Sequence, residues 1–237
     1  MPYYHKAGKF PEKRHTQFRK PNGELYAEEL VSTEGFSSIF SLVYHSHPPT
    51  LVKHIGEPID VAPKAAIANN MQNRSFITFK TEAKADFLES RVVQLYNSDL
   101  YMAVAAPKES MSTYFYKNAD ADEVIFVHEG SGYLQTLYGK IHFEYGDYLV
   151  IPRGVIYQMH FNDSKNRLMI IESFSPIKPP KRYLNSMGQF LEHSPYCERD
   201  IKLPTDLETI DEMGDFKVMI KKGDQLFPYT YGSHPFD

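Results

Sequence analysis

Short runs of alternating apolar and polar residues fill the middle of the chain. They are densest over residues 122–161, DEVIFVHEGSGYLQTLYGKIHFEYGDYLVIPRGVIYQMHF. Alternation with a period of two is typical of strands with one buried face, and glycines between the runs mark turns. The stretch therefore predicts a series of β-hairpins, separated at Gly130, Gly132, Gly139 and Gly146.

Further strands are expected on both sides of this stretch. The patterns RSFITFK, RVVQLYNS, DLYMAVAAP, RLMIIESF and DFKVMIKKGDQ predict strands within 74–80, 91–98, 99–107, 167–174 and 215–225. A single helical turn is predicted over 83–90. A short helix is predicted over Thr205–Met213, with Thr205 as N-cap and Glu208 completing a capping box.

Two spacing patterns of Glu, Gly and Pro residues make the fold prediction for the hairpin stretch more specific. Glu123 and Gly130 have the spacing of the second half of the first cupin motif, G-x5-H-x-H-x3-4-E-x6-G. Gly146, Pro152 and Gly154 have the spacing that opens the second motif, G-x5-P-x-G-x2-H-x3-N. The segment thus resembles a cupin. We expect Gly130, Pro152 and Gly154 to shape turns between its strands.

The metal ligands of a cupin are missing from these motifs. Depending on the spacer, the first two histidine slots hold Tyr116 and Asn118 or Lys117 and Ala119, and the later slot holds Tyr157. A neutral phenol, amide, methyl or ammonium group replaces imidazole poorly as a metal ligand. Glu123 alone does not make a metal site. We therefore expect the barrel to have a structural role, with no metal ligand and no catalytic residue.

Nearby histidines do not restore the site. Side chains on a strand alternate between faces, so His160 and His128 point away from the faces of Tyr157 and Glu123. His142 lies on a polar face. The only H-x-H of the chain, His45 and His47, is followed at once by two prolines, and hydrogen-bonded structural histidines are the favoured interpretation.

The predicted fold is mostly β: a cupin-like jelly-roll β-barrel or sandwich with a degenerate metal site and an irregular N-terminal arm. We expect residues 1–73 to form an arm and irregular segment packed on the barrel, 74–182 the barrel, and 183–237 a connector to a C-terminal cupin domain absent from the chain. A proline-rich exit at 176–182 suits that boundary. With 14% aromatic residues and no Trp, the composition favours strands.

Charge and composition argue against several classes of protein. A formal net charge of −4 gives no basic field for nucleic acid, although lysines and arginines interleave with aromatics in residues 1–23. The single cysteine, Cys197, allows no internal disulfide and fits a reducing compartment. No stretch is apolar enough to span a bilayer. We expect a cytoplasmic protein that binds neither membrane nor nucleic acid.

Five segments together resemble the N-terminal part of homogentisate 1,2-dioxygenases. They are YYHKAGKFPEKRHTQF, LYAEELVSTEGFS, YHSHPPT, the degenerate cupin segment with IPRGV, and the final GSHPFD. The resemblance implies a non-haem Fe(II) enzyme that uses O2 to open the ring of homogentisate, giving maleylacetoacetate in tyrosine and phenylalanine catabolism. It also implies hexamers built from trimers.

The same resemblance implies that the iron, held by two His and one Glu, lies in a domain beyond the SHPFD stretch. We therefore expect this chain to bind no cofactor itself and to act as scaffold and oligomerisation region. Two alternatives stay open. One is a stand-alone, metal-free cupin-like module that binds a small ligand between Tyr116, Glu123 and Tyr157. The other is a different metal enzyme that uses His45, His47 and His160.

Overall fold

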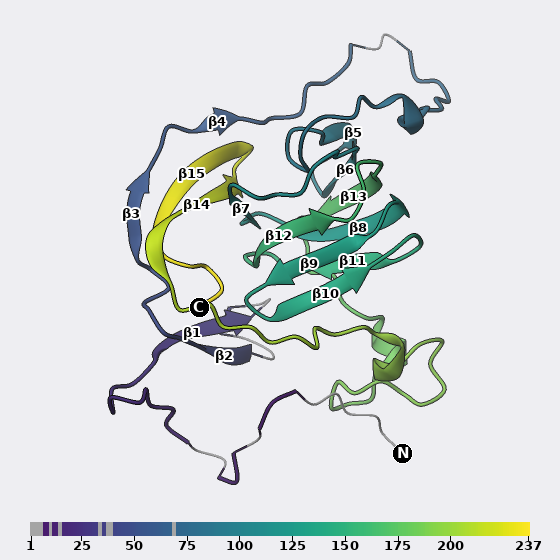
Figure 1. Cartoon of the computed structure of the whole chain (residues 1–237). Helices are drawn as coiled ribbons and strands as arrows, with labels where there is room; N and C mark the ends of the chain where they lie inside the picture. The colour runs from purple at the N-terminus through teal and green to yellow at the C-terminus, as the bar shows by residue number, and fades with distance from the viewer. Residues whose placement is uncertain (1–6, 10, 14–15, 33–34, 37–39, 68–69) are drawn as a thin grey trace.

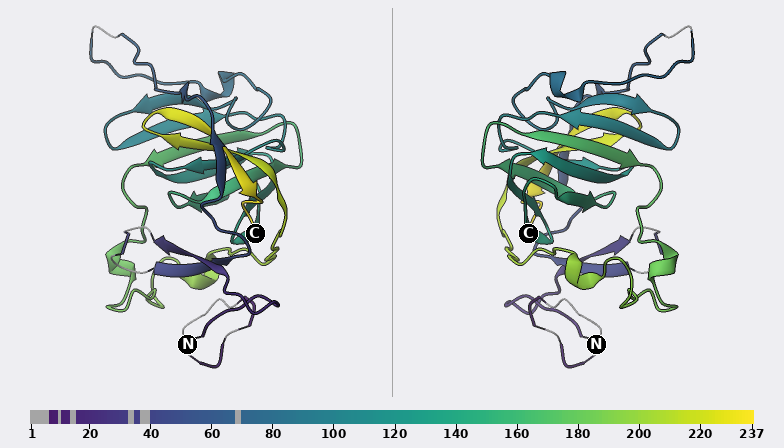
Figure 2. Two further views of the ribbon diagram at one scale, coloured as in Figure 1. Left: turned by 90° about the vertical axis from the view of Figure 1, so that its left-hand side faces the viewer. Right: turned by 90° about the vertical axis from the view of Figure 1, so that its right-hand side faces the viewer.

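The computed structural model describes residues 7–9, 11–13, 16–32, 35–36, 40–67 and 70–237. Two β-sheets pack face to face, and a separate two-stranded ribbon lies at one end of the molecule (Figures 1 and 2). The strands are short and the only helices in the described part are single 3-10 turns: η1 (Thr78–Lys80), η2 (Lys181–Tyr183) and η3 (Glu198–Asp200). The predicted mostly β, cupin-like sandwich is confirmed, with open sheet edges rather than a closed barrel.

The larger sheet combines strands from distant parts of the chain. In spatial order they are β10 (Gly139–Phe143), β9 (Gly132–Thr136), β12 (Ile156–Phe161), β7 (Phe115–Asn118), β14 (Met213–Lys222), β15 (Gln225–Ser233) and β3 (Val52–Ile55), with β4 (Ile59–Asp60) also on β15. All pairs are antiparallel except β7 with β14. In Figure 1 the yellow β14 and β15 lie beside the blue β3. This sheet thus takes strands from all three predicted segments, 1–73, 74–182 and 183–237.

The smaller sheet is antiparallel throughout. Its order is β11 (Tyr148–Ile151), β8 (Asp122–Glu129), β13 (Arg167–Ser173), β6 (Leu100–Ala105) and β5 (Val92–Tyr96). Alternate residues of these strands point at the larger sheet. Along β6 and along β13, half-buried and buried residues alternate over the whole strand. The period-two pattern therefore corresponds to one buried and one half-buried face on each of these strands.

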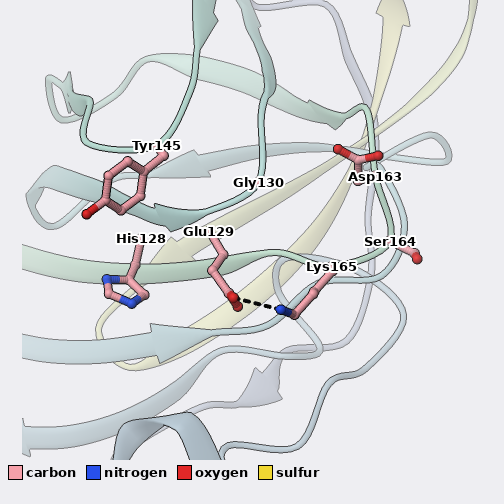
Figure 3. A pocket seen from close by; sticks show the side chains of 7 residues that line it. All are labelled: His128, Glu129, Gly130, Tyr145, Asp163, Ser164 and Lys165. Carbon is pink, nitrogen blue, oxygen red and sulfur yellow. Dashed lines mark ion pairs between the residues drawn. The ribbon is translucent and has the colours of Figure 1, made fainter.

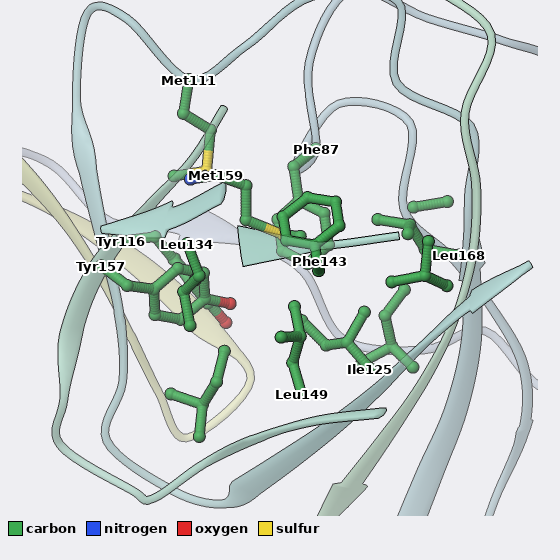
Figure 4. Close-up of a cluster of buried hydrophobic side chains, with 14 of the residues drawn as sticks. Phe87, Met111, Tyr116, Ile125, Leu134, Phe143, Leu149, Tyr157, Met159 and Leu168 are labelled. Atoms are coloured by element: carbon green, nitrogen blue, oxygen red, sulfur yellow. Dashed lines mark hydrogen bonds between the residues drawn. The ribbon is translucent and has the colours of Figure 1, made fainter. Parts of the chain in front are cut away.

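Aliphatic and aromatic side chains from both sheets fill the space between them (Figure 4). Ile125 and Ile170 come from the smaller sheet, Leu134 and Met159 from the larger, and all are at most 5% exposed. Each such side chain stabilises the fold by roughly 1.5–3 kcal/mol relative to an exposed one. Phe87, from the turn before β5, is fully buried among them.

The third sheet is a ribbon of β1 (Ala27–Ser32) and β2 (Phe40–His45). A two-stranded ribbon is at best marginally stable on its own. It contacts the sandwich through side chains near the end of β2, described below. Figure 2 shows it set apart from the two larger sheets.

Two predicted elements are wrong. Residues 74–77 have no regular structure and 78–80 form η1, because Ile77 and Phe79 are 66% and 54% exposed and no strand pairs with them. The helix over Thr205–Met213 does not form. The backbone of this segment instead forms hydrogen bonds with other parts of the chain: Lys140 N–H donates to the Asp206 carbonyl, and Ile210 N–H donates to the Phe236 carbonyl. A helix this short is stable only when packing supports it. Of the turn predicted over 83–90, only 86–90 forms, closed by Ser90 N–H to Asp86 O, while Lys84 makes a parallel β-bridge to Pro107.

No helix within the described residues is long and apolar enough to cross a bilayer.

Candidate functional site

The residues at the cupin ligand positions meet inside the sandwich. The sequence left two pairs open on β7, and the structure places Tyr116 and Asn118, 1% and 3% exposed, on the inner face, while Lys117 and Ala119 are only half-buried. Glu123 on β8 and Tyr157 on β12 are both fully buried. The degenerate site therefore exists as a spatial cluster.

Tyr157 contacts both Glu123 and Tyr116. The Tyr157 hydroxyl donates a 2.8 Å hydrogen bond to Glu123 Oε2. The Tyr116 and Tyr157 rings meet edge to face with centroids 5.4 Å apart. Figure 4 shows both rings side by side below Met159. Burial, and then the charge of Glu123, raise the pKa of the Tyr157 hydroxyl well above its ordinary value, so it stays a neutral donor.

Three charged residues complete this cluster. Arg91 donates from Nη1 to Glu123 Oε1 at 2.8 Å and from Nη2 to Glu172 Oε1 at 2.6 Å. Glu172 Oε2 accepts a 2.9 Å bond from Asn118 and a short ion-pair contact from Lys221 Nζ. We call Arg91, Asn118, Glu123, Tyr157, Glu172 and Lys221 the interior cluster.

Strand register explains why these residues meet. Glu123 on β8 and Glu172 on β13 are direct cross-strand partners, and Asn118 on β7 and Lys221 on β14 are partners across the parallel pair. Two like charges directly opposite each other are destabilising. The guanidinium of Arg91, which bonds to both carboxylates, removes that repulsion.

The electrostatics favour the charged forms of Arg91 and Glu172. Burial disfavours a charged guanidinium, but Glu172 and Glu123 outweigh it and hold the pKa of Arg91 well above its usual range. Burial likewise raises the pKa of Glu172, but Arg91 and Lys221 outweigh it, and the net pKa is lowered. Two cations and two carboxylates thus balance within the cluster.

A cupin-type metal does not fit these residues. The ligand slots offer phenols and an amide, and both carboxylates already bind nitrogen cations. The histidines lie elsewhere, as expected: His142 is exposed, and His160 stacks on Tyr133 with centroids 4.5 Å apart. Among the described residues no three His, Cys, Asp or Glu side chains are grouped to hold a metal ion.

Arg91, Glu172 and Lys221 were missed in the sequence. A signal was present for two of them. Glu172 occupies an inward position of RLMIIESF, in step with Leu168 and Ile170, and Lys221 is in step with the buried Met219. A charged residue on the buried face of a strand needs a partner. No local pattern marks Arg91, which lies after a turn.

A second charged cluster joins the β1–β2 ribbon to the end of the described chain. His45 Nδ1 lies 2.7 Å from Asp237 Oδ1 and its Nε2 lies 3.1 Å from Glu29 Oε2. Asp237 Oδ2 accepts from His47 N–H at 2.7 Å, and His47 Nε2 lies 2.6 Å from Asp211 Oδ1. The hydrogen bonds to Asp237 and Glu29 raise the pKa of His45 to about 9. These contacts connect the YHSHPPT and SHPFD segments.

A shallow hollow lies at the rim of the smaller sheet (Figure 3). It is lined by His128, Glu129, Gly130, Tyr145, Asp163, Ser164 and Lys165. Its one ion pair joins Glu129 to Lys165, whose side chain is 82% exposed. An exposed pair of this kind holds no preorganised chemistry, and we assign none to the hollow.

Comparison with known proteins identifies the class. Residues 56–237 match the family described as homogentisate 1,2-dioxygenase N-terminal, so the chain belongs to that family. It is also 36% identical over its whole length to a protein of Saccharolobus solfataricus that carries a provisional name as a dioxygenase. The chain spans 61% of that relative's length. The chain is thus related to dioxygenases.

Two solved structures with partial similarity are described as cupin proteins. One is a cupin superfamily protein from Desulfitobacterium hafniense, 15% identical, covering 46% of this chain and 98% of that one with a TM-score of 0.37. Another is a cupin-2 domain protein from Shewanella frigidimarina, 25% identical, covering 35% of this chain and 78% of that one with a TM-score of 0.31.

Proposed function

We propose that this chain is the N-terminal part of an Fe(II)-dependent dioxygenase that opens the ring of homogentisate with O2, giving maleylacetoacetate. In this proposal it supplies the scaffold and a surface for assembly into a homo-oligomer, a hexamer built from trimers. Iron, substrate and O2 bind in the remainder of the protein. The family match over residues 56–237 is the observation that carries the proposal.

The interior cluster supports a non-catalytic role for this sandwich. Glu123, the one motif carboxylate retained, has both oxygens hydrogen-bonded, to Arg91 and Tyr157. Ring opening on iron requires open coordination positions for substrate and O2. A centre with a buried arginine and neutral phenols offers none.

The outer face of the smaller sheet supports the assembly role. Cross-strand registers align Tyr148, Phe126, Met169, Val104 and Val92 in one row across all five strands. Tyr148 is 63% and Val92 is 41% exposed. An extended apolar surface of this kind is typical of interfaces with other protein segments or subunits.

The two alternatives have less support. A ligand-binding module would need Tyr116, Glu123 and Tyr157 as pocket lining, but they are at most 1% exposed, and Tyr157 contacts both of the others. A metal enzyme using His45, His47 and His160 would need these side chains together. His160 stacks on Tyr133 within the larger sheet, while His45 and His47 bind carboxylates beside the ribbon.

Oxygen consumption tests the proposal. Purified 1–237, supplied with Fe(II) and ascorbate, should show no homogentisate-dependent O2 uptake. The same chain extended in cis by the C-terminal segment of its relative should show uptake and form maleylacetoacetate, detected by its absorbance. Turnover by 1–237 alone, with contaminating full-length enzyme excluded by mass spectrometry, would contradict the proposal.

A further inference from the structure

We propose that the guanidinium of Arg91 takes the place that a metal ion has in a cupin, so that this sandwich carries a built-in cation and is closed to metal. The inference concerns the interior cluster and is independent of the substrate of the whole protein. It rests on geometry, on the occupancy of the carboxylate oxygens and on charge balance.

The geometry places Arg91 at the ligand positions. Its Nη1 lies 2.8 Å from Glu123 Oε1, the only motif ligand type retained, and Tyr157 in the later histidine slot holds Glu123 Oε2. The Arg91 side chain is 9% exposed and its guanidinium carbon lies 5.5 Å from the centroid of the buried Phe87 ring. The turn that buries Phe87 therefore also aims Arg91 inward.

All four carboxylate oxygens are occupied. Glu123 accepts from Arg91 and Tyr157, and Glu172 accepts from Arg91 on one oxygen and from Asn118 and Lys221 on the other. A divalent ion would have to break these bonds. It would also add two positive charges beside two buried cations whose charge is already neutralised.

Only arginine suits this position. The carboxylates lie opposite each other on β8 and β13, and Arg91 reaches them with two different nitrogens of one planar fork. A lysine ammonium is a compact point charge that cannot reproduce this two-pronged geometry. The bridging role thus distinguishes Arg91 from a generic buried cation.

The test compares Arg91→Met with Arg153→Met in purified 1–237. Arg153 is exposed, and its guanidinium donates a long 3.3 Å hydrogen bond to Asp120 O, so its variant should melt like the parent. Arg91→Met leaves Glu123 without a cation and should lower Tm by about 10 °C. Guanidinium chloride at low millimolar concentration should raise the Tm of Arg91→Met but not of the parent or of Arg153→Met, with equal NaCl as salt control.

A double variant covers the case in which Arg91→Met does not fold. Arg91→Met with Glu123→Gln removes one charge of each sign and should recover most of the lost Tm. Equal instability of the single and double variants, or no rescue of a folded Arg91→Met by guanidinium, would overturn the proposal. So would stoichiometric uptake of Mn(II) or Fe(II) by the parent that Glu123→Gln abolishes.

Discussion

Two charged clusters hold distant parts of this chain together, and they differ in burial. The interior cluster joins the two sheets, and the side chains of Arg91, Glu172 and Lys221 are at most 9% exposed. The second cluster joins the β1–β2 ribbon to the C-terminal segment, and its members range from His45, 4% exposed, to Asp211, 66% exposed. The same kinds of ion pair therefore act in two different dielectric environments.

The difference shows in how each cluster depends on pH. The pKa of Glu172 is lowered, so its contribution to stability is present above its unfolded value near 4.5 and is lost as pH falls through the folded value. The pKa of His45 is raised to about 9, so its contribution is complete below its ordinary value of 6.5 and is lost as pH rises through 9. The pKa of Glu29 is also lowered, chiefly by its hydrogen bond to His45. We therefore expect acid to weaken both clusters, and rising pH through 9 to weaken the ribbon attachment through His45.

The largest effect is expected for Glu172→Gln. The change leaves Arg91 and Lys221 with a single buried carboxylate, and an uncompensated buried charge costs about 3–5 kcal/mol. Urea unfolding at pH 7 measures the loss. Glu129→Gln is the matched control, because its close partner Lys165 is 82% exposed and its other partner, Arg167, lies 3.9 Å away, so the midpoint should change little. Equal midpoints for the two variants would show that the interior cluster contributes no more than a surface pair.

This comparison also separates what the sequence predicts from what it does not. The alternation on β6, β8 and β13, and the glycine spacing around Glu123, are local patterns, and they predicted the mostly β sandwich and the motif positions that Tyr116, Asn118 and Tyr157 occupy. The structure adds that Gly130 and Gly154 have positive φ, 99° and 88°, as turn glycines require.

The clusters depend on contacts between residues far apart in sequence. Lys221 reaches Glu172 across 49 positions, and Asp237 reaches His45 across 192. Lys221 enters the interior cluster because β7 pairs with β14, and Asp237 meets His45 because the segment after β15 reaches the end of β2. Neither contact has a signature in a short window of sequence, so neither Lys221 nor the role of Asp237 was predicted.

A turn next to the interior cluster gives the second prediction. The Gly154 N–H donates to Asn118 O at 2.8 Å, and an added Cβ would meet only Lys117 Cε, 4.0 Å away. Gly154→Val therefore costs backbone strain alone, roughly 1–3 kcal/mol. Gly130→Val should cost more, because its Cβ would also overlap the Asn166 side chain. Chemical denaturation ranks the two, and a loss of under about 0.5 kcal/mol for Gly154→Val would show that no left-handed backbone is required there.

The ribbon attachment gives the third prediction, for His45→Gln. Glutamine keeps a hydrogen-bonding group but no titratable charge beside Glu29 and Asp237. Near pH 6 the parent should be more stable by about 2 kcal/mol, since each pKa unit corresponds to about 1.4 kcal/mol and Glu29 is partly solvated. The difference should shrink between pH 6.5 and 9. Unfolding midpoints at several pH values measure it, and a constant difference across that range would show that His45 is not charged in the fold.

The smallest effect is expected at the exposed end of the same cluster. His47 Nε2 lies 2.6 Å from Asp211 Oδ1, a shorter distance than either His45 contact, yet the Asp211 side chain is 66% exposed. Water and salt screen such a pair, so Asp211→Asn should lower stability by under about 1 kcal/mol at low ionic strength. In 0.5 M NaCl the loss should not be measurable, because the screening length is already near 10 Å at ~0.1 M salt and this concentration is about five times higher. The His45→Gln loss should persist in the same salt. If Asp211→Asn instead costs as much as His45→Gln, short distance rather than burial sets the strength of these ion pairs, and the distinction between the interior and ribbon clusters fails.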